Sequence, residues 1–186
     1  MPKIYTKKGD RGTTSLLTGE VVTKDCVSLQ VAGELDELNC VIGIVIAQIK
    51  KNKIKDSRLL NMLVSIQRVL FKVGAEVSAL QKKNVSADGR VSPKEITELE
   101  SQIDEWWNIL PPLKNFILPG GNLPAAHLQL ARAVCRRAER ELIALGKVAK
   151  VRLELYKYLN RLSDFLFVAA RWVNYRLGGG ERVVKK

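Results

Sequence analysis

The chain has 186 residues, of which 46% are hydrophobic and 27% charged, a composition typical of one soluble globular domain. It contains no run of about 18 apolar residues that would predict a transmembrane helix, and its first residues lack the apolar core of a secretory signal. The formal net charge of +12 favours a polyanionic partner, although a solvated basic surface is the more common reason for such a charge.

Residues that usually carry metal or nucleophile chemistry are few. Cys26, Cys40 and Cys135 are scattered without a Cys-x-x-Cys pair, and His127 is the only histidine. This pattern gives no support to a zinc site, a disulfide framework or a histidine-dependent triad. We therefore expect a protein of the reducing cytoplasm that does not use an activated side-chain nucleophile.

The stretch TKKGDRGTTSL, from Thr6 to Leu16, combines two glycines, three basic residues and four hydroxyl groups. This composition suits the binding of phosphate groups. It is not a Walker A loop, because Gly9 and Gly12 lie too close together and no lysine follows the second glycine. We expect residues 1–25 to form a phosphate-wrapping segment.

Apolar residues recur at three- and four-residue spacing through the rest of the chain and predict five helices. The predicted spans are about 27–50, 59–80, 92–110, 122–145 and 155–177. Ser92 and Glu95 form a capping box, and Asn122 is the expected N-cap of the fourth helix. Short extended pieces are expected only near Ile4-Tyr5 and Leu16-Leu17.

These elements predict an all-α fold, a five-helix bundle made by residues 1–186 as a single domain. A polar loop is expected over residues 82–92, and a flexible tail over residues 178–186, which begins with three glycines.

The fourth predicted helix carries a row of arginines. Arg132, Arg136 and Arg140 are spaced four apart, and Arg137 lies beside them. Apolar residues are expected on the opposite face: Leu130, Val134, Ala138 and Leu142. A solvated face is the ordinary explanation, but arginine binds phosphate in a bidentate manner and a glycine turn precedes this helix. A phosphate-binding surface is therefore favoured.

Asp36 belongs to a stripe of mostly small residues on the first predicted helix: Ala32, Asp36, Cys40, Gly43 and Ala47. Because small residues allow another helix to approach closely, we expect Asp36 to be partly buried and paired with an arginine of the fourth helix. A favourable interaction with the helix dipole is the alternative, but Asp36 lies beyond the first turn.

The last predicted helix places four residues along one face beside its leucines: Asn160, Asp164, Phe167 and Arg171. The spacing leaves open whether Asn160 makes a structural hydrogen bond or binds a ligand. Trp106 lies in the apolar stripe of the third helix and is expected in the core, and His127 is expected to be a local packing or surface residue.

Five segments occur in one order along the chain: YTKKGDRGTTSL at 5–16, GELDELN at 33–39, FILPGG at 116–121, CRRAER at 135–140 and YLNRLSD at 158–164. Together they resemble the PduO-type ATP:cob(I)alamin adenosyltransferases. Members of that family often carry a histidine in the pattern LHxAR, where this chain has Gln129, with His127 two residues earlier. No role of that histidine is carried over.

The resemblance implies a five-helix bundle that forms homotrimers with active sites between subunits. It assigns these residues to ATP: Thr6, Lys7, Lys8, Gly9, Thr14, Ser15, Lys24, Arg136, Arg137, Ala138, Glu139, Arg140 and Asn160. It assigns these to the reaction: Arg136, Asn160, Phe116, Asp36 and Arg132. Phe116 would keep the lower axial position of cobalt empty, and Asp36 would form a helix–helix salt bridge with Arg132.

The implied reaction joins the cobalt of cob(I)alamin to the 5′ carbon of ATP and releases triphosphate. Mg²⁺ would arrive with ATP and not on a protein site. A cobalamin reductase and a B12-dependent enzyme are possible partners, and no membrane association is expected. Two alternatives stay open: a nucleotide-binding regulator without turnover, and a basic helical protein that binds nucleic acid, for which no recognition motif is present.

Overall fold

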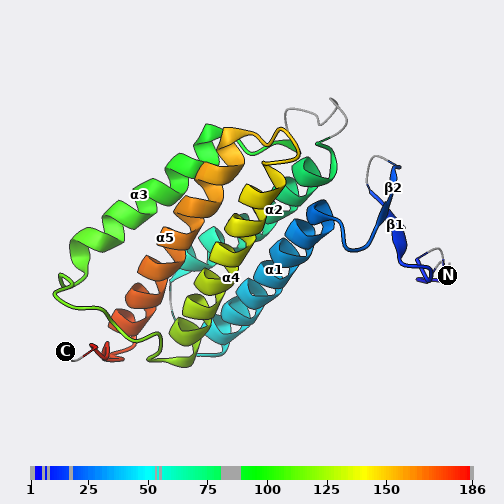
Figure 1. Ribbon diagram of the computed structural model, residues 1–186. Coiled ribbons are helices and arrows are strands. Elements are labelled where there is room, and N and C mark those ends of the chain that lie inside the picture. Colours follow the sequence, from blue (N-terminus) through cyan, green and yellow to red (C-terminus); the bar gives the residue numbers. More distant parts are fainter. Residues whose placement is uncertain are drawn as a thin grey trace.

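The computed structural model describes residues 3–5, 7, 9–16, 19–52, 54, 56–80 and 89–184. Within these residues, five helices form a bundle and a two-stranded hairpin lies beside it (Figure 1). The helices are α1 Val27–Lys51, α2 Ser57–Ser78, α3 Pro93–Ile109, α4 Leu123–Leu145 and α5 Leu153–Arg176. The predicted five-helix bundle is confirmed, and each predicted helix lies within a few residues of its observed bounds.

The hairpin consists of β1, Thr13–Ser15, and β2, Val21–Thr23, which pair in antiparallel register with Thr14 opposite Val22. The prediction of extended pieces was partly wrong. The first strand ends next to Leu16, but Ile4 and Tyr5 lie outside any strand, and β2 was not predicted. Leu17 lies outside the described residues.

Helices α4 and α5 are the centre of the bundle, because α4 packs against α1 and α5, α5 also packs against α3, and α2 covers α1. The buried face of α4 is apolar and includes Val134, Ala138 and Leu142. Leu130, expected on this face, is 50% exposed. None of the helices in the described part of the chain is long and apolar enough to cross a membrane.

Aromatic rings join α3 to α5. Trp106 is 2% exposed and stacks on Trp172, with ring centroids 5.3 Å apart, and Phe165 lies at 5.6 Å. The Trp172 indole Nε1 donates to Asp56 Oδ2 at 2.7 Å, and the other carboxylate oxygen of Asp56 caps α2. The predicted core position of Trp106 is therefore confirmed, and burial of large rings stabilises this end of the bundle.

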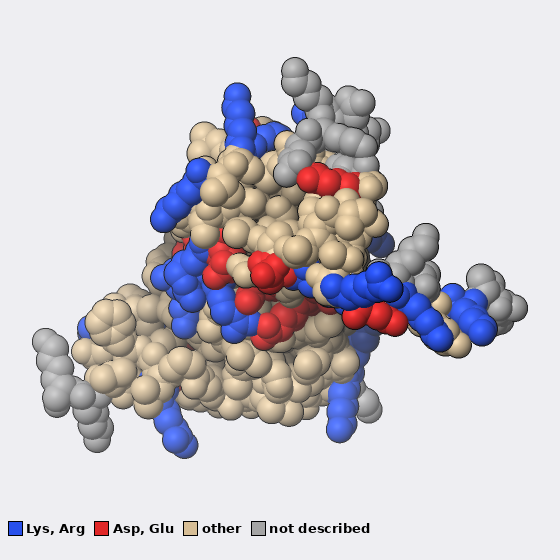
Figure 2. Space-filling view, turned by 45° about the vertical axis from the view of Figure 1, so that its right-hand side comes forward, with Lys and Arg blue, Asp and Glu red and all other residues tan. Residues whose placement is uncertain are grey.

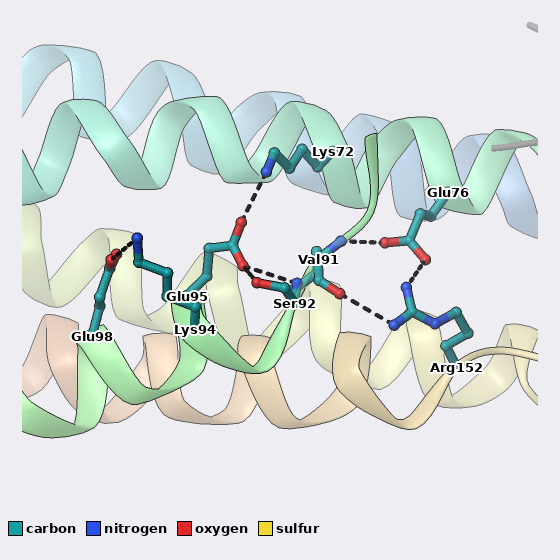
Figure 3. Close-up of polar contacts among 8 residues, drawn as sticks. All are labelled: Lys72, Glu76, Val91, Ser92, Lys94, Glu95, Glu98 and Arg152. Atoms are coloured by element: carbon teal, nitrogen blue, oxygen red, sulfur yellow. Dashed lines mark hydrogen bonds and ion pairs between the residues drawn. The ribbon is translucent and has the colours of Figure 1, made fainter. Parts of the chain in front are cut away.

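A buried carboxylate ties the start of α5 to the chain before α3 (Figure 3). Glu76 of α2 accepts from the Val91 backbone N–H at 2.6 Å and from Arg152 Nη1 at 2.7 Å. Arg152 Nη2 donates in turn to the Val91 carbonyl at 3.2 Å. Because the Glu76 side chain is only 4% exposed, these bonds compensate for the cost of burying its charge.

The start of α3 carries the predicted capping box. The Glu95 carboxylate accepts from the Ser92 backbone N–H at 2.9 Å and from Lys72 Nζ at 2.8 Å (Figure 3). Burial raises the pKa of Glu95, but the hydrogen bonds from Lys72 and Ser92 outweigh it and lower the pKa from 4.5 to about 2. The capping residue thus also connects α3 to α2. Most of the loop predicted at 82–92 lies outside the described residues.

Candidate active site

Two adjoining cavities lie along α3, α4 and α5 and the loop that joins α3 to α4. The first, the Phe116 cavity, encloses about 720 Å³ and is lined by Leu113, Lys114, Asn115, Phe116, Ile117, Pro119, Gln129, Arg132, Phe167 and Val184. The second, the arginine cavity, encloses about 610 Å³ and is lined by Glu100, Ile103, Asp104, Trp107, Arg132, Arg136, Arg161, Ser163, Asp164, Phe167 and Val168. Arg132 and Phe167 belong to both walls, so a ligand in one cavity lies next to a ligand in the other.

The wall of the Phe116 cavity is mostly apolar. Phe116 itself is 87% exposed, so covering its ring with an apolar ligand would be favourable. Its ring is free to contact a flat apolar ligand rather than the protein core.

Two buried polar residues of α5 hold the loop that carries Phe116. Arg171, 2% exposed, donates to the Pro111 carbonyl at 2.7 Å at the start of the loop. Asn174 donates to the Gly120 carbonyl at 3.0 Å and accepts from the Asn122 backbone N–H at 2.9 Å at its end. Asn122 is the N-cap residue of α4, as predicted, but its side chain makes no capping hydrogen bond.

The C-terminal residues complete this wall, and the prediction of a flexible tail needs correction over residues 181–184. The Val184 N–H donates to the Phe116 carbonyl at 2.8 Å, and the Leu118 N–H donates to the Arg182 carbonyl at 2.7 Å. Glu181 accepts from the buried Arg171 at 2.7 Å. The tail is ordered here because the backbone groups of a short loop find their hydrogen-bond partners in it.

The arginine cavity is lined by cations and acids from three helices. Arg132 and Arg136 come from α4, and Arg161 of α5 donates to Glu100 of α3 at 2.8 Å. Burial raises the pKa of Asp164, against the lowering effect of nearby Arg161. Arginine side chains grouped beside a cavity suit a phosphate-bearing ligand.

Asn160 lies beside this cavity in a chain of hydrogen bonds between α4 and α5. Its side-chain Nδ2 donates to Glu139 Oε1 at 3.1 Å, and its Oδ1 accepts from Arg161 Nη1 at 3.1 Å. A hydrogen bond within the protein is thus present, but Asn160 remains exposed and can be reached by a ligand. The structure brings Asn160 and Glu139 together, as expected for one site.

The other residues of the arginine row have different surroundings. Arg137 binds Glu34 and Glu37 of α1, and these ion pairs raise its pKa, with the Glu34 hydrogen bond the main cause. Arg140 is exposed and donates to the Arg136 carbonyl at 3.1 Å. Ala138 is fully buried in the core, so its side chain is not available to ATP in this chain.

The expectations for Asp36 within one chain were wrong. Asp36 is exposed, and it has no hydrogen bond or ion pair among the described residues. The acids of α1 that bind an arginine of α4 are Glu34 and Glu37, because they lie on the face of α1 that meets α4. Asp36 instead lines a groove of about 340 Å³ between α1 and α2, beside the 72% exposed Phe71.

Within one chain, the partner of Arg132 is Gln129. Its Nε donates to Gln129 Oε1 at 2.8 Å, one turn earlier on α4. The groove around Asp36 shares no lining residue with either cavity around Arg132. An Asp36–Arg132 salt bridge is therefore absent from the described part of a single chain.

The N-terminal segment folds on itself beside the hairpin. Lys7 has a positive φ of 59°, and the Lys24 backbone N–H donates to the Gly12 carbonyl at 2.9 Å. A side chain at Gly9 would meet Lys24 Nζ at 3.1 Å, so the glycine allows this lysine to approach the turn. Thr14 and Ser15 lie in β1, whereas Thr6 and Lys8 lie outside the described residues.

Sequence reasoning missed several residues of the cavity walls. Trp107, Arg161 and Val184 line the cavities but were not among the predicted site residues. Arg161 lies inside one of the five recognised segments, which was the available signal. Trp107 follows a core tryptophan and therefore faces away from the core, whereas nothing in the sequence marks Val184.

Comparison with protein families matches residues 4–173 to the family described as cobalamin adenosyltransferase. The chain belongs to this family. It is 38% identical over 179 residues to the corrinoid adenosyltransferase of Bacillus subtilis (strain 168), and the aligned residues cover 96% of this chain and 90% of that protein. It is 37% identical over 191 residues to the corrinoid adenosyltransferase of Homo sapiens, covering 100% of this chain and 74% of that protein.

Solved structures of the same family share the fold. A variant of the PduO-type ATP:corrinoid adenosyltransferase from Lactobacillus reuteri, complexed with cobalamin and ATP, has a TM-score of 0.91 and 32% identity, covering 99% of this chain and 97% of that one. Another variant from the same organism, complexed with ATP, has a TM-score of 0.85, also with 32% identity, covering 98% and 100%. The recognised family resemblance is therefore confirmed.

Proposed function

We infer that this chain transfers the 5′-deoxyadenosyl group of ATP to the cobalt of cob(I)alamin, which gives adenosylcobalamin and triphosphate. The observation that carries this conclusion is the pair of adjoining cavities with a shared wall of Arg132 and Phe167. An apolar cavity with an exposed Phe116 suits the flat corrin ring, and a cavity with three arginines suits a nucleotide. Relatives described as binding cobalamin and ATP support the same conclusion.

The reaction needs no nucleophile from the protein, because the reduced corrinoid is itself the nucleophile. The protein holds the 5′ carbon of ATP in line with cobalt and neutralises the charge on the departing triphosphate. Arg132 lies where the two substrates would meet, and Arg136 lines the nucleotide cavity on the same helix. Phe116 would occupy the lower side of the corrin ring and keep the axial position apolar.

We propose the remaining nucleotide contacts from the family assignment. Lys7, Gly9, Lys24 and the hydroxyl residues of the N-terminal segment would surround the triphosphate, together with the α4 residues 136–140 and Asn160. The described residues contain no cluster of three His, Cys, Asp or Glu side chains that could hold a metal. We propose that Mg²⁺ is carried by the phosphate oxygens of ATP, which are ligands it prefers.

The arrangement of one chain supports a site shared between copies, and we propose a homotrimer. The hairpin lies beyond one end of the bundle, whereas the loop of Phe116 and the C terminus lie at the other (Figure 1). One chain therefore does not bring its own phosphate-wrapping segment to its Phe116 cavity. The exposed Asp36, beside Phe71 in the α1–α2 groove, would accept Arg132 of a neighbouring copy.

The alternative of a nucleic-acid-binding protein receives less support. Acidic and basic side chains alternate in a band across one face, and a broad area without charge lies beneath it (Figure 2). Nucleic-acid binding favours a continuous basic surface instead. A regulator that binds ATP without turnover stays the second candidate, because the site geometry alone does not require the reaction. The free cysteines among the described residues agree with the cytoplasmic setting that we propose.

The test is an anaerobic assay in which chemically reduced cobalamin, ATP and Mg²⁺ are mixed with the protein. We expect loss of the cob(I)alamin absorption and formation of a light-sensitive alkylcobalamin that depends on ATP. Arg136→Ala and Asn160→Ala should severely lower the rate. The control is Arg58→Ala, which removes a surface arginine paired with Glu105 and should leave the rate unchanged. Full activity in both site variants would reject the residue assignments.

Two further outcomes distinguish the alternatives. ATP binding without conversion of cob(I)alamin would favour the regulator. A salt-dependent shift with DNA and no ATP binding would favour the nucleic-acid-binding protein. If turnover is observed, a reductase that supplies cob(I)alamin and an enzyme that consumes the product become the partners to seek.

A further inference from the structure

Gln129 is a buried polar residue in the wall of the Phe116 cavity. It is 6% exposed, lies on α4 and borders the cavity together with Phe116 and Arg132. Its Oε1 accepts from Arg132 Nε at 2.8 Å. Burying a side-chain amide is costly unless it is hydrogen-bonded, and the hydrogen bond to Arg132 offsets part of that cost.

The direction of this hydrogen bond fixes the orientation of the amide. The Arg132 guanidinium can only donate, so the atom of Gln129 that faces Nε must be the carbonyl oxygen. The bond uses Nε and leaves the two terminal nitrogens of Arg132 for a ligand and for the Asp36 carboxylate that we propose a neighbouring copy supplies. It also leaves the Gln129 amide nitrogen without a protein partner among the described residues, in a side chain that lines the cavity.

Arg132 is the charged residue common to both cavities, and its long side chain has several rotatable bonds. A guanidinium held at Nε loses much of this freedom before substrate binds, which lowers the entropy cost of placing it between two ligands. Glutamine performs this role without a charge and without titrating in the physiological pH range.

We propose that Gln129 is a positioning residue that fixes Arg132 at the junction of the corrinoid and nucleotide cavities and offers its remaining amide N–H to the corrinoid. This inference rests on the proposed function, since it takes the ligand of the Phe116 cavity to be a corrinoid. The rim of a corrinoid carries carboxamide groups, whose carbonyl oxygens accept hydrogen bonds from an amide N–H. The residue acts on corrinoid binding and not on the triphosphate.

The experiment compares Gln129→Met with wild type, because methionine keeps the length and volume of the side chain but cannot accept from Arg132. The matched control is Gln102→Met on α3. Gln102 is also buried, at 1% exposure, but its amide has no partner among the described residues and it lines neither cavity. Thermal unfolding of each variant shows whether the fold is retained.

We expect Gln129→Met to raise the KM for cob(I)alamin about tenfold, the effect of losing one hydrogen bond to a charged group, and to leave the KM for ATP unchanged. Equilibrium dialysis with cob(II)alamin in the presence of ATP should show the same loss of affinity without turnover. Gln102→Met should match wild type in both measurements. Equal corrinoid affinity in Gln129→Met and wild type would overturn the proposal.

Gln129→His tests the acceptor role itself. Neutral imidazole can accept from Arg132 Nε, whereas imidazolium cannot and would repel the guanidinium. Corrinoid affinity relative to wild type should therefore be retained near pH 8 and fall as the pH drops through about 6.5. Wild type at each pH corrects for the other charged groups of the two walls, which are Lys114, Glu100, Asp104, Arg136, Arg161 and Asp164.

The outcomes separate this inference from the proposed function. If wild type neither binds cob(II)alamin nor forms an alkylcobalamin, both are rejected. If wild type binds and Gln129→Met binds equally well, only the positioning role is rejected. If Gln129→His shows no pH effect relative to wild type, the hydrogen bond to Arg132 does not contribute to binding.

Discussion

The ion pair of Arg171 and Glu181 predicts that a C-terminal residue outside the bundle contributes to its stability. Arg171 is 2% exposed, and Glu181 accepts from its Nε at 2.7 Å and from Nη2 at 3.1 Å. Glu181→Gln removes the negative charge and keeps the size of the side chain. The buried guanidinium is then left with the Pro111 carbonyl and the Trp107 ring, whose centroid lies 5.1 Å from Arg171 Cζ.

The expected cost follows from these contacts. Removing one partner of a fully buried ion pair costs about 3–5 kcal/mol. The Glu181 side chain is 23% exposed, and glutamine can still accept one hydrogen bond, so we expect a loss of about 2 kcal/mol in the free energy of unfolding. For a domain of this size the corresponding change in Tm is about 4–8 °C.

Urea denaturation of wild type and Glu181→Gln measures this loss directly. The control is Glu100→Gln, which removes the partner of Arg161 from a pair whose side chains are about 40% exposed. Such a pair contributes about 0–1 kcal/mol. If the two variants lose the same free energy, the argument from burial is wrong, and the C-terminal residues do not anchor the loop of Phe116.

Three further results are expected. Phe116→Ala should change the free energy of unfolding by less than about 0.5 kcal/mol, since Phe116 is 87% exposed. The same variant should slow adenosylation about tenfold. A large loss of stability in urea would show that the ring belongs to the core. Glu76→Gln should cost about 1–3 kcal/mol in thermal unfolding, because it weakens the buried bond to Arg152, and an unchanged Tm would contradict this. Because the pKa of Glu95 is about 2 when folded and 4.5 ordinarily, its stabilisation is complete above pH 4.5 and is lost as the pH falls towards 2. Glu95→Gln should remove about 1–2 kcal/mol of that acid-dependent stability. The free energy of unfolding is measured in urea at several pH values for both proteins. If it depends on pH equally in Glu95→Gln and wild type, the prediction is wrong.

The helices could be predicted because their causes are local. Apolar spacing, the capping box of Ser92 and Glu95, and the Pro111-Pro112 stop all act within one or two turns of the chain. The hairpin was recognised less well, since strands of three residues carry little periodicity, and β2 depends on pairing with β1.

The site was predicted through motifs, and the errors concern the direction of side chains. The small residues around Asp36 indicated close helix packing, but they could not say which helix approaches. Within one chain α2 borders this face and leaves Asp36 exposed in an open groove. The arginine row was read as one surface. In the structure Arg137 binds acids of α1, whereas Arg132 and Arg136 line a cavity.

The sequence by itself determined the five helices and the family, and it predicts which residues bind phosphate. Only the tertiary structure decided that Arg132 is held by Gln129, that residues 181–184 pair with the loop of Phe116, and that Arg171 is buried beneath that loop. The physical reason is the range of the interactions. Helix periodicity and capping depend on neighbours along the chain, whereas a cavity wall and a buried ion pair depend on which surfaces the fold brings together.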